Sequence, residues 1–242
     1  MRKLAILILM ALALMLPPVA GAQPKQASPA DVAKTIEQGY AMLKDLRAAF
    51  TQRSSIAALN REQKSSGELF IKKPVSGAAM FRFNYTRPSQ QIVSNGKTVW
   101  FYQPDNKQVI VAEMAGALDS GGLALSYLTG MGRISGDFNI GFAGSGRDGK
   151  GNYQLELVPK KPGQAVAKIV LTVAAAAIDA YLRDGEVREP FPILGSVLVD
   201  SQGNRTTFEF SRPKVNQGLA ASLFTMKIPA GVEVIHQGAH TK

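Results

Sequence analysis

The sequence predicts a mainly β protein of the α+β class, in which helices cover the apolar face of a broad antiparallel sheet. Between Gly67 and Tyr102, three runs separated by turn signals alternate side chains with period two, as strands do. Residues 28–50 instead repeat apolar side chains at helical spacing. A sheet with so apolar a face must be covered, because exposing it to water is unfavourable.

The first 22 residues have the features of a secretory signal peptide. Two basic residues precede an apolar run, Leu4–Leu16, that is too short to span a bilayer. Two prolines end the run, and Ala20–Ala22 has the A-x-A pattern of a cleavage site. We expect residues 1–22 to be removed, with an uncleaved membrane anchor as the alternative, and residues 23–242 to form a single exported domain.

The cysteine content and the net charge limit the kinds of partner that we expect for this protein. The chain has no cysteine, so an exported domain of this kind depends on its hydrophobic core for stability. Its formal charge of +10 falls to +8 without Arg2 and Lys3, which favours acidic partners or anionic membrane surfaces. The basic residues are scattered and form no aromatic–basic motif, so we expect a solvated basic surface and no nucleic-acid partner.

The first expected element is a helix with a marked N-terminus. Ser28 is its N-cap, Pro29 its first residue, and Asp31 follows the cap by three positions. Its apolar stripe comprises Val32, Ile36, Tyr40, Leu43, Leu46 and Phe50. We expect this helix to end near residues 51–53, with residues 54–66 as a polar loop or part of a first strand.

The strands that follow present two faces. One face carries Leu69, Ile71 and Lys73 on the first strand, and Phe81, Phe83 and Tyr85 on the second. The third strand ends at Tyr102, and a turn at residues 104–107 leads to another strand over residues 108–114.

The sequence pattern changes in residues 115–138, which are rich in glycine and in which apolar and polar side chains do not alternate. We expect one or two short helices here. Glycine lowers helix stability by about 1 kcal/mol per residue, so these helices depend on packing. Further strands are expected at 138–143, 152–158, 165–174, 196–200, 205–212, 224–228 and 232–235. Residues 174–177 favour a helix, but Pro190 and Pro192 oppose a long one.

Motifs for catalysis, nucleotides or metals are not supported. Gly144–Gly149 matches G-x-G-x-x-G, but a strand follows it, and the helix that would bind a pyrophosphate is missing. His236 and His240 are spaced as two metal ligands, but they lie in a polar tail without a third. G-x-S-x-G is absent. We therefore expect no enzyme activity, no cofactor and no metal site.

A binding function is the remaining hypothesis. The helix, the sheet and the central segment together have the apolar side chains to enclose a cavity for a greasy ligand. An ordinary packed core is the alternative, and the pattern alone favours it.

Several segments, taken in order, resemble the periplasmic outer-membrane lipoprotein carrier family, LolA. The first is an amphipathic N-terminal helix ending in Phe50-Thr51-Gln52, and the other matching segments are Gly67–Pro74, Phe81–Pro88, Ser94–Tyr102 and Leu223–Val234. The resemblance extends over residues 30–235. It implies a half-open antiparallel β-barrel, with an N-terminal helix and short central helices covering the concave face as a lid.

The resemblance also implies a function. Proteins of this family carry the acyl chains of lipoproteins through the periplasm. They receive them from an inner-membrane ABC-type release complex and pass them to an outer-membrane acceptor, which is a lipoprotein receptor or the membrane itself. Such a carrier is a monomer, is not an enzyme and uses no cofactor. Burial is worth about 0.8 kcal/mol per CH₂, so one long acyl chain in water costs on the order of 10 kcal/mol.

Alternation and helical spacing then indicate which residues bind lipid. We expect Tyr40, Leu43 and Phe50 to contribute from the first helix, Leu69, Ile71, Phe81, Phe83 and Tyr85 from the sheet, and Leu123, Leu125 and Leu128 from the lid. Lys73 stands where the family commonly has an arginine before the proline. A lysine has three donors but no planar fork, so we expect a lid latch to backbone carbonyls at the ends of residues 115–132, weaker or differently aimed than an arginine's.

Two functions remain as alternatives, which are carriage of another exported lipid and sensing of such a lipid. The same fold serves as a carrier or a sensor of another exported lipid, although sensors of this kind usually carry a second domain that we do not find here. The outer-membrane acceptor of the pathway shares the fold, but it needs a lipidated cysteine that this sequence lacks.

Overall fold

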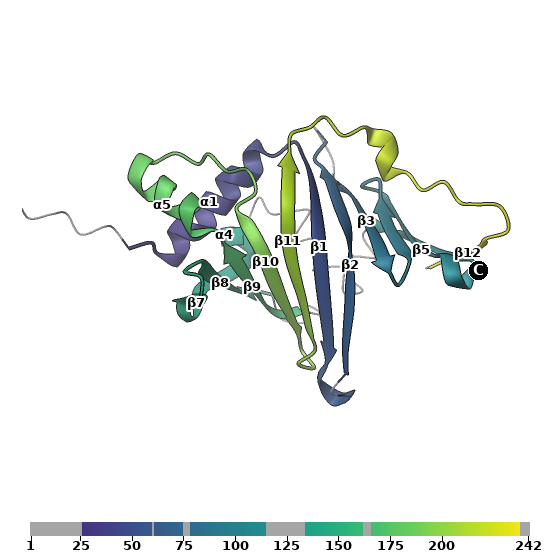
Figure 1. The fold of residues 1–242 in the computed structure, drawn as a ribbon, viewed down its shortest axis with the longest axis horizontal. Helices are drawn as coiled ribbons and strands as arrows, with labels where there is room; N and C mark the ends of the chain where they lie inside the picture. The colour runs from purple at the N-terminus through teal and green to yellow at the C-terminus, as the bar shows by residue number, and fades with distance from the viewer. Residues whose placement is uncertain (1–25, 60, 75–77, 115–133, 162–165, 238–242) are drawn as a thin grey trace, which may run out of the picture.

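A single twelve-stranded sheet dominates the computed structural model, which describes residues 26–59, 61–74, 78–114, 134–161 and 166–237 (Figure 1). The strand order in these residues is β12-β6-β5-β4-β3-β2-β1-β11-β10-β9-β8-β7. Neighbours are antiparallel except β12 and β6, which run parallel. The expected mainly β architecture, an open curved sheet with a few helices, is confirmed.

The elements have the following bounds. The strands are β1 Asp45–Ile56, β2 Arg61–Lys72, β3 Met80–Arg87, β4 Gln90–Ser94, β5 Thr98–Gln103, β6 Gln108–Glu113, β7 Phe138–Arg147, β8 Tyr153–Pro159, β9 Val166–Val173, β10 Ile193–Asp200, β11 Arg205–Val215 and β12 Glu233–His236. The helices are α1 Pro29–Met42, α4 Ile134–Asp137 and α5 Ala175–Asp184, with 3-10 turns η1 Ala57–Leu59, η2 Pro104–Asn106 and η4 Ala221–Phe224.

Helix α1 begins as its sequence predicts. The Ser28 hydroxyl accepts a hydrogen bond from the Asp31 amide at 3.2 Å, and the Asp31 carboxylate accepts one from the Ser28 amide at 2.9 Å. This capping box satisfies two of the four free amides of the first turn. The helix packs against α4, α5, β7 and β8, so it lies over the β7–β10 end of the sheet (Figure 1).

The prediction that this helix reaches residues 51–53 is wrong. The helix ends at Met42, and β1 begins at Asp45, so Leu46 and Phe50 lie on a strand and not on the helix. A spacing of four residues puts two side chains on one face of a helix, but also on one face of a strand. Strand β1 pairs with β2 on one side and β11 on the other, and this pairing favours the extended form.

The C-terminal segment also departs from expectation. No strand forms over residues 224–228, where η4 is followed by irregular chain. Asp45, 3% exposed, anchors the start of this segment, because its carboxylate accepts hydrogen bonds from the amides of residues 217–219 at 2.7–3.2 Å. The chain then crosses the sheet beside β3 and reaches β12, whose last residue, His236, therefore lies in a strand and not in a loose tail.

Helix α5 is longer than the sequence pattern favours. It runs ten residues and ends at Gly185, whose φ of +74° is the left-handed conformation that suits a glycine after a helix. The two prolines that oppose a helix lie beyond this end. No helix in the described part of the chain is long and apolar enough to cross a bilayer.

Candidate functional site

The buried face of the sheet, here called the inner face, carries most of the side chains predicted to bind lipid. Strand pairing places Phe83 opposite Leu69, Phe81 opposite Ile71, and Leu46 opposite Ile71 on the other side. Leu69, Ile71, Phe81 and Phe83 are each at most 1% exposed and belong to one hydrophobic cluster. The parity predicted from alternation is therefore confirmed for these strands.

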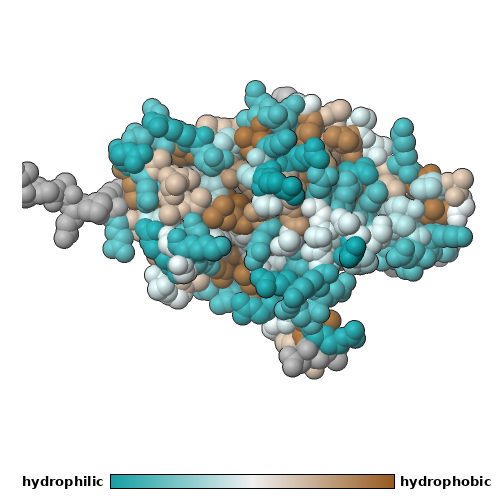
Figure 2. All heavy atoms as spheres, viewed as in Figure 1, coloured by the Kyte–Doolittle hydropathy of each residue, from teal (hydrophilic) through white to brown (hydrophobic). Residues whose placement is uncertain are grey.

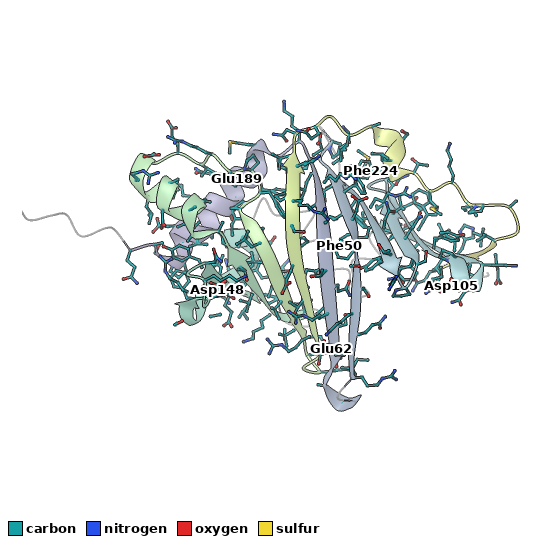
Figure 3. The ribbon with its side chains drawn as sticks, viewed as in Figure 1. Phe50, Glu62, Asp105, Asp148, Glu189 and Phe224 are labelled. Carbon is teal, nitrogen blue, oxygen red and sulfur yellow. The ribbon has the colours of Figure 1, made fainter. Side chains whose placement is uncertain are left out.

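Phenylalanine and tyrosine rings form the centre of this face. The Phe50 ring lies 5.5 Å from the Phe83 ring, 5.0 Å from the Tyr85 ring and 5.9 Å from the Phe208 ring, measured between centroids (Figure 3 labels Phe50 on β1). Phe208 in turn stacks on Phe210 at 6.1 Å. Edge-to-face and offset contacts of this kind are each worth about 0.5–1.5 kcal/mol beyond burial.

The same rings show that the inner face is concave. Phe83 on β3 and Phe208 on β11 are three strand positions apart, about 14 Å on a flat sheet, yet their centroids are 6.4 Å apart. The side chains therefore lean toward a common axis.

Gly67 makes the closest of these contacts possible. It is paired with Phe50 on one side and Tyr85 on the other, so it separates two rings that nevertheless meet at 5.0 Å. A β-carbon at Gly67 would lie 2.0 Å from the Asn84 carbonyl oxygen, which excludes any side chain without a shift of backbone. The Gly67–Pro74 segment thus begins with a residue that the close approach of the β3 backbone requires.

One margin of the inner face is polar. The Tyr85 hydroxyl donates to Gln52 Oε1 at 2.7 Å, and Gln52 Nε2 donates to Ser54 at 3.0 Å. Burial raises the pKa of Tyr85, which keeps the phenol neutral and able to donate. Along β1 the inner side chains therefore change from apolar, up to Phe50, to polar at Gln52 and Ser54, and we call Gln52, Ser54 and Tyr85 the polar margin.

Lys73 reaches a different partner from the one predicted. Its ammonium donates to the Tyr40 carbonyl oxygen in the last turn of α1 and lies 4.4 Å from the centre of the Tyr40 ring. Burial lowers the pKa of this lysine. The expected acceptors, in residues 115–132, lie outside the described residues. A cation at a helix C-terminus also interacts favourably with the helix dipole, and α1 has no basic residue of its own there.

The remaining predicted residues have mixed outcomes. Tyr40 and Leu43 are buried in the same cluster. Tyr40 belongs to α1, and Leu43 is the residue that caps the C-terminal end of α1. Phe50 joins them from β1. Leu123, Leu125 and Leu128 lie outside the described residues. The sequence reasoning missed Phe208 and Phe210, although their alternation around Glu209 is the signal that identified Phe81 and Phe83.

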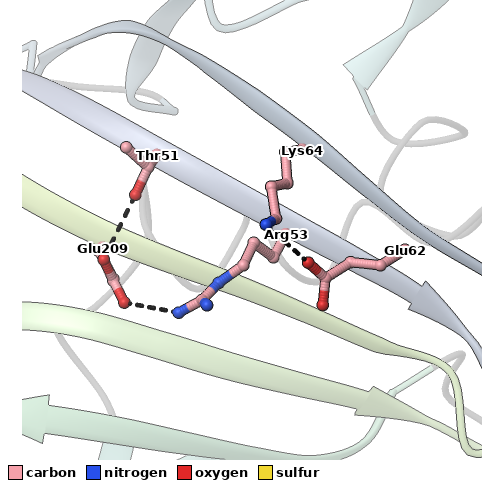
Figure 4. Close-up of polar contacts among 5 residues, drawn as sticks. All are labelled: Thr51, Arg53, Glu62, Lys64 and Glu209. Carbon is pink, nitrogen blue, oxygen red and sulfur yellow. Dashed lines mark hydrogen bonds and ion pairs between the residues drawn. The ribbon is translucent and has the colours of Figure 1, made fainter.

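The opposite face of the same strands, here called the outer face, is polar. Arg53 donates to Glu209 at 2.9 Å, Thr51 donates to the same carboxylate at 3.4 Å, and Lys64 lies 3.5 Å from Glu62 (Figure 4). These pairs are exposed, and such pairs contribute about 0–1 kcal/mol each. Hydrophilic side chains also cover most of the surface that Figure 2 shows.

Two hollows open on this outer face. One, of about 430 Å³, is lined by the Thr51–Arg53 and Lys64–Ser66 segments with Arg87 and Glu209. The other, of about 440 Å³, lies between β2–β5 and the C-terminal segment, where Arg82 donates to the Leu223 carbonyl oxygen at 3.1 Å. In the part of the chain that is described, no three His, Cys, Asp or Glu side chains are grouped to hold a metal ion.

The fold and the inner face together define the class of this protein. It is a curved, mostly antiparallel sheet whose continuous apolar face is covered at one end by a helix. The chain belongs to the LolA family, because the family model described as outer membrane lipoprotein carrier protein LolA matches residues 41–227.

Two relatives identified by sequence agree with this assignment. An outer-membrane lipoprotein carrier protein of Azotobacter vinelandii is 31% identical over 238 residues, covering 98% of this chain and 100% of the relative. Another, from Methylobacillus flagellatus, is 29% identical and covers 85% of this chain and 89% of the relative. A LolA superfamily protein of known structure from Nitrosomonas europaea is 14% identical, with a TM-score of 0.43 over 83% of this chain and 99% of that one.

Proposed function

We propose that this protein is a periplasmic carrier that holds the acyl chains of lipoproteins against the inner face and moves them from the inner membrane towards the outer membrane. Membership of the LolA family supports the proposal. The structural observation that carries it is the concave, aromatic inner face, which is continuous from β3 to β11 and stops at a polar margin.

Loading requires the inner face to open. Leu69, Ile71 and Phe83 are fully buried, so an acyl chain gains access only when the elements above the sheet move away. Shielding a long acyl chain is worth on the order of 10 kcal/mol, and this gain offsets part of the free energy of opening the inner face. In this proposal Lys73 is a latch, because it joins the end of β2 to the last turn of α1.

The same proposal includes the export of the protein, its domain organisation and its partners. Residues 1–22 act as a cleaved signal peptide, and residues 23–242 form the carrier domain. Its partners are acylated lipoproteins, an inner-membrane ABC-type release complex and an outer-membrane acceptor. The protein acts as a monomer and catalyses no reaction.

A single charge on the inner face tests the proposal. Phe83→Glu places a carboxylate among four rings, where an unpaired charge is strongly disfavoured. The matched control is Thr86→Glu, which puts the same group at an exposed position of the same strand. We expect the wild type and Thr86→Glu to bind a triacylated lipopeptide, and folded Phe83→Glu to bind it at least about tenfold more weakly.

Circular dichroism of each variant establishes whether the fold is kept. Failure of the wild-type protein to bind the lipopeptide contradicts carriage. Equal binding by folded Phe83→Glu contradicts the assignment of the inner face, and complete unfolding of that variant favours an ordinary core.

A further inference from the structure

Ser196 on β10 is a buried polar residue on the apolar inner face. It is 1% exposed, and its cross-strand neighbours are Leu171 on β9 and Phe208 on β11. Both neighbours belong to the hydrophobic cluster, as does Leu198, two residues along on the same face of β10. Among the described residues, the Ser196 hydroxyl has no hydrogen-bond partner.

Ser196 lies in the same row as Gln52, although on β10 the apolar inner face continues past this row to Leu198. Ser196 is paired with Phe208, and Phe208 is paired with Gln52, so the three residues form one row across three adjacent strands. At a strand spacing of about 4.8 Å, the row spans about 10 Å from β10 to β1. Tyr85 extends it from the other side through its 2.7 Å hydrogen bond to Gln52.

The other polar side chains of this row already donate hydrogen bonds within the protein. The Tyr85 hydroxyl donates to Gln52, and the Gln52 amide donates to Ser54. Ser196 therefore supplies a donor that the protein itself does not use. A buried hydroxyl without a partner lowers stability, so an apolar residue of similar size would serve a plain core better.

The chemistry of an attached acyl chain matches this arrangement. The chain itself is apolar, but the end by which it is attached carries an ester or amide carbonyl, which accepts hydrogen bonds. Towards α1, the inner face carries apolar side chains such as Leu46, Ile71 and Phe81. Its polar residues there already have partners within the protein, because Ser94 accepts from the Gly96 amide at 3.1 Å and Lys73 donates to the Tyr40 carbonyl oxygen. Building on the proposed function, we propose that Ser196 donates a hydrogen bond to the ester or amide carbonyl of a bound acyl chain.

This contact gives the ligand a direction. The methyl end of the acyl chain lies towards α1, beside Ile71 and Phe81. The carbonyl lies at Ser196, and the polar remainder of the lipoprotein leaves past Gln52 and Tyr85. Ser196 is thus a positioning residue, which favours acyl chains that are attached through an ester or amide carbonyl.

Two probes that differ only in their carbonyls test the proposal. One is a diacylglyceryl lipopeptide with ester-linked palmitoyl chains, and the other is its ether-linked analogue. Dissociation constants are measured by displacement of a fluorescent fatty acid from the purified protein. We expect Ser196→Ala to weaken binding of the ester probe about fivefold and to leave the ether probe unchanged.

Ser211→Ala is the matched control, because Ser211 is exposed and pairs with Ala49, on the outer face of the neighbouring strand. We expect it to leave both dissociation constants unchanged. We also expect the midpoint of thermal unfolding of ligand-free Ser196→Ala to equal or exceed that of the wild type, which distinguishes a ligand contact from a structural one.

The outcomes separate this inference from the proposed function. Unchanged binding of the ester probe by Ser196→Ala, equal weakening of both probes, or a lowered unfolding midpoint overturns the role of Ser196 and leaves carriage intact. If the wild-type protein binds neither probe, carriage itself is refuted, and the role of Ser196 is refuted with it.

Discussion

Lys73→Met is the most informative change to the proposed latch. The substitution keeps the length and the apolar stem of the side chain but removes its ammonium. That ammonium donates to the Tyr40 carbonyl oxygen and lies over the Tyr40 ring. The variant therefore breaks the contact between the end of β2 and the last turn of α1 without opening a cavity.

The size of the effect follows from the two contacts. A hydrogen bond from a charged donor contributes about 1.5–3 kcal/mol, and the lower end applies because Lys73 is only partly buried. An exposed cation–π contact adds about 0.5 kcal/mol. Losing about 2 kcal/mol raises the open population of the C-terminal turn of α1 about 30-fold.

Amide hydrogen exchange measures this opening directly. We expect exchange in residues 39–43 to accelerate by about the same factor, since local opening sets the rate. Lys72→Met is the control, because its ammonium donates to the Leu219 carbonyl oxygen at 2.7 Å and does not contact α1. Equal protection of residues 39–43 in wild type and Lys73→Met refutes the latch.

Three other substitutions, the first with a matched control, test the packing of the fold. Gly67→Ala should lower the free energy of unfolding in urea by about 3 kcal/mol, because its β-carbon would lie 2.0 Å from the Asn84 carbonyl oxygen. Gly149→Ala, which meets no atom within 4 Å, should change it by less than about 0.5 kcal/mol. Asp45→Ala leaves three amides without their acceptor and should cost about 3 kcal/mol, with faster proteolysis near residue 218. Phe224→Ala removes a fully buried ring and should cost about 3–5 kcal/mol, measured by thermal unfolding.

The sequence predicted much of the sheet because alternation is a local signal. Phe81, Phe83 and Tyr85 show their shared face without any knowledge of the neighbouring strands. The same signal misled at Leu46 and Phe50, where a four-residue spacing fits a helix and a strand equally well. Only the pairing of β1 on both sides decided between them.

The composition of the site was harder to predict, since it depends on non-local pairing. Phe50 is paired with Phe210, a residue 160 positions later, and no local pattern reports that contact. Phe208 and Phe210 alternate as clearly as Phe81 and Phe83, but the sequence does not say that β11 adjoins β1. The partner of Lys73 was missed for a similar reason, because a helix ending at Met42 brings its last carbonyls within reach.

Site-specific photo-crosslinking in the periplasm shows whether the inner face holds lipoprotein acyl chains. A photoreactive phenylalanine analogue replaces Phe83, on the inner face, or Tyr102, which lines the hollow on the outer face. We expect acylated lipoproteins to crosslink to position 83 and not to position 102, as measured by mass spectrometry of the adducts. Crosslinks to lipoproteins from position 102 alone, or adducts at position 83 that contain only other lipids, would contradict lipoprotein carriage on the inner face.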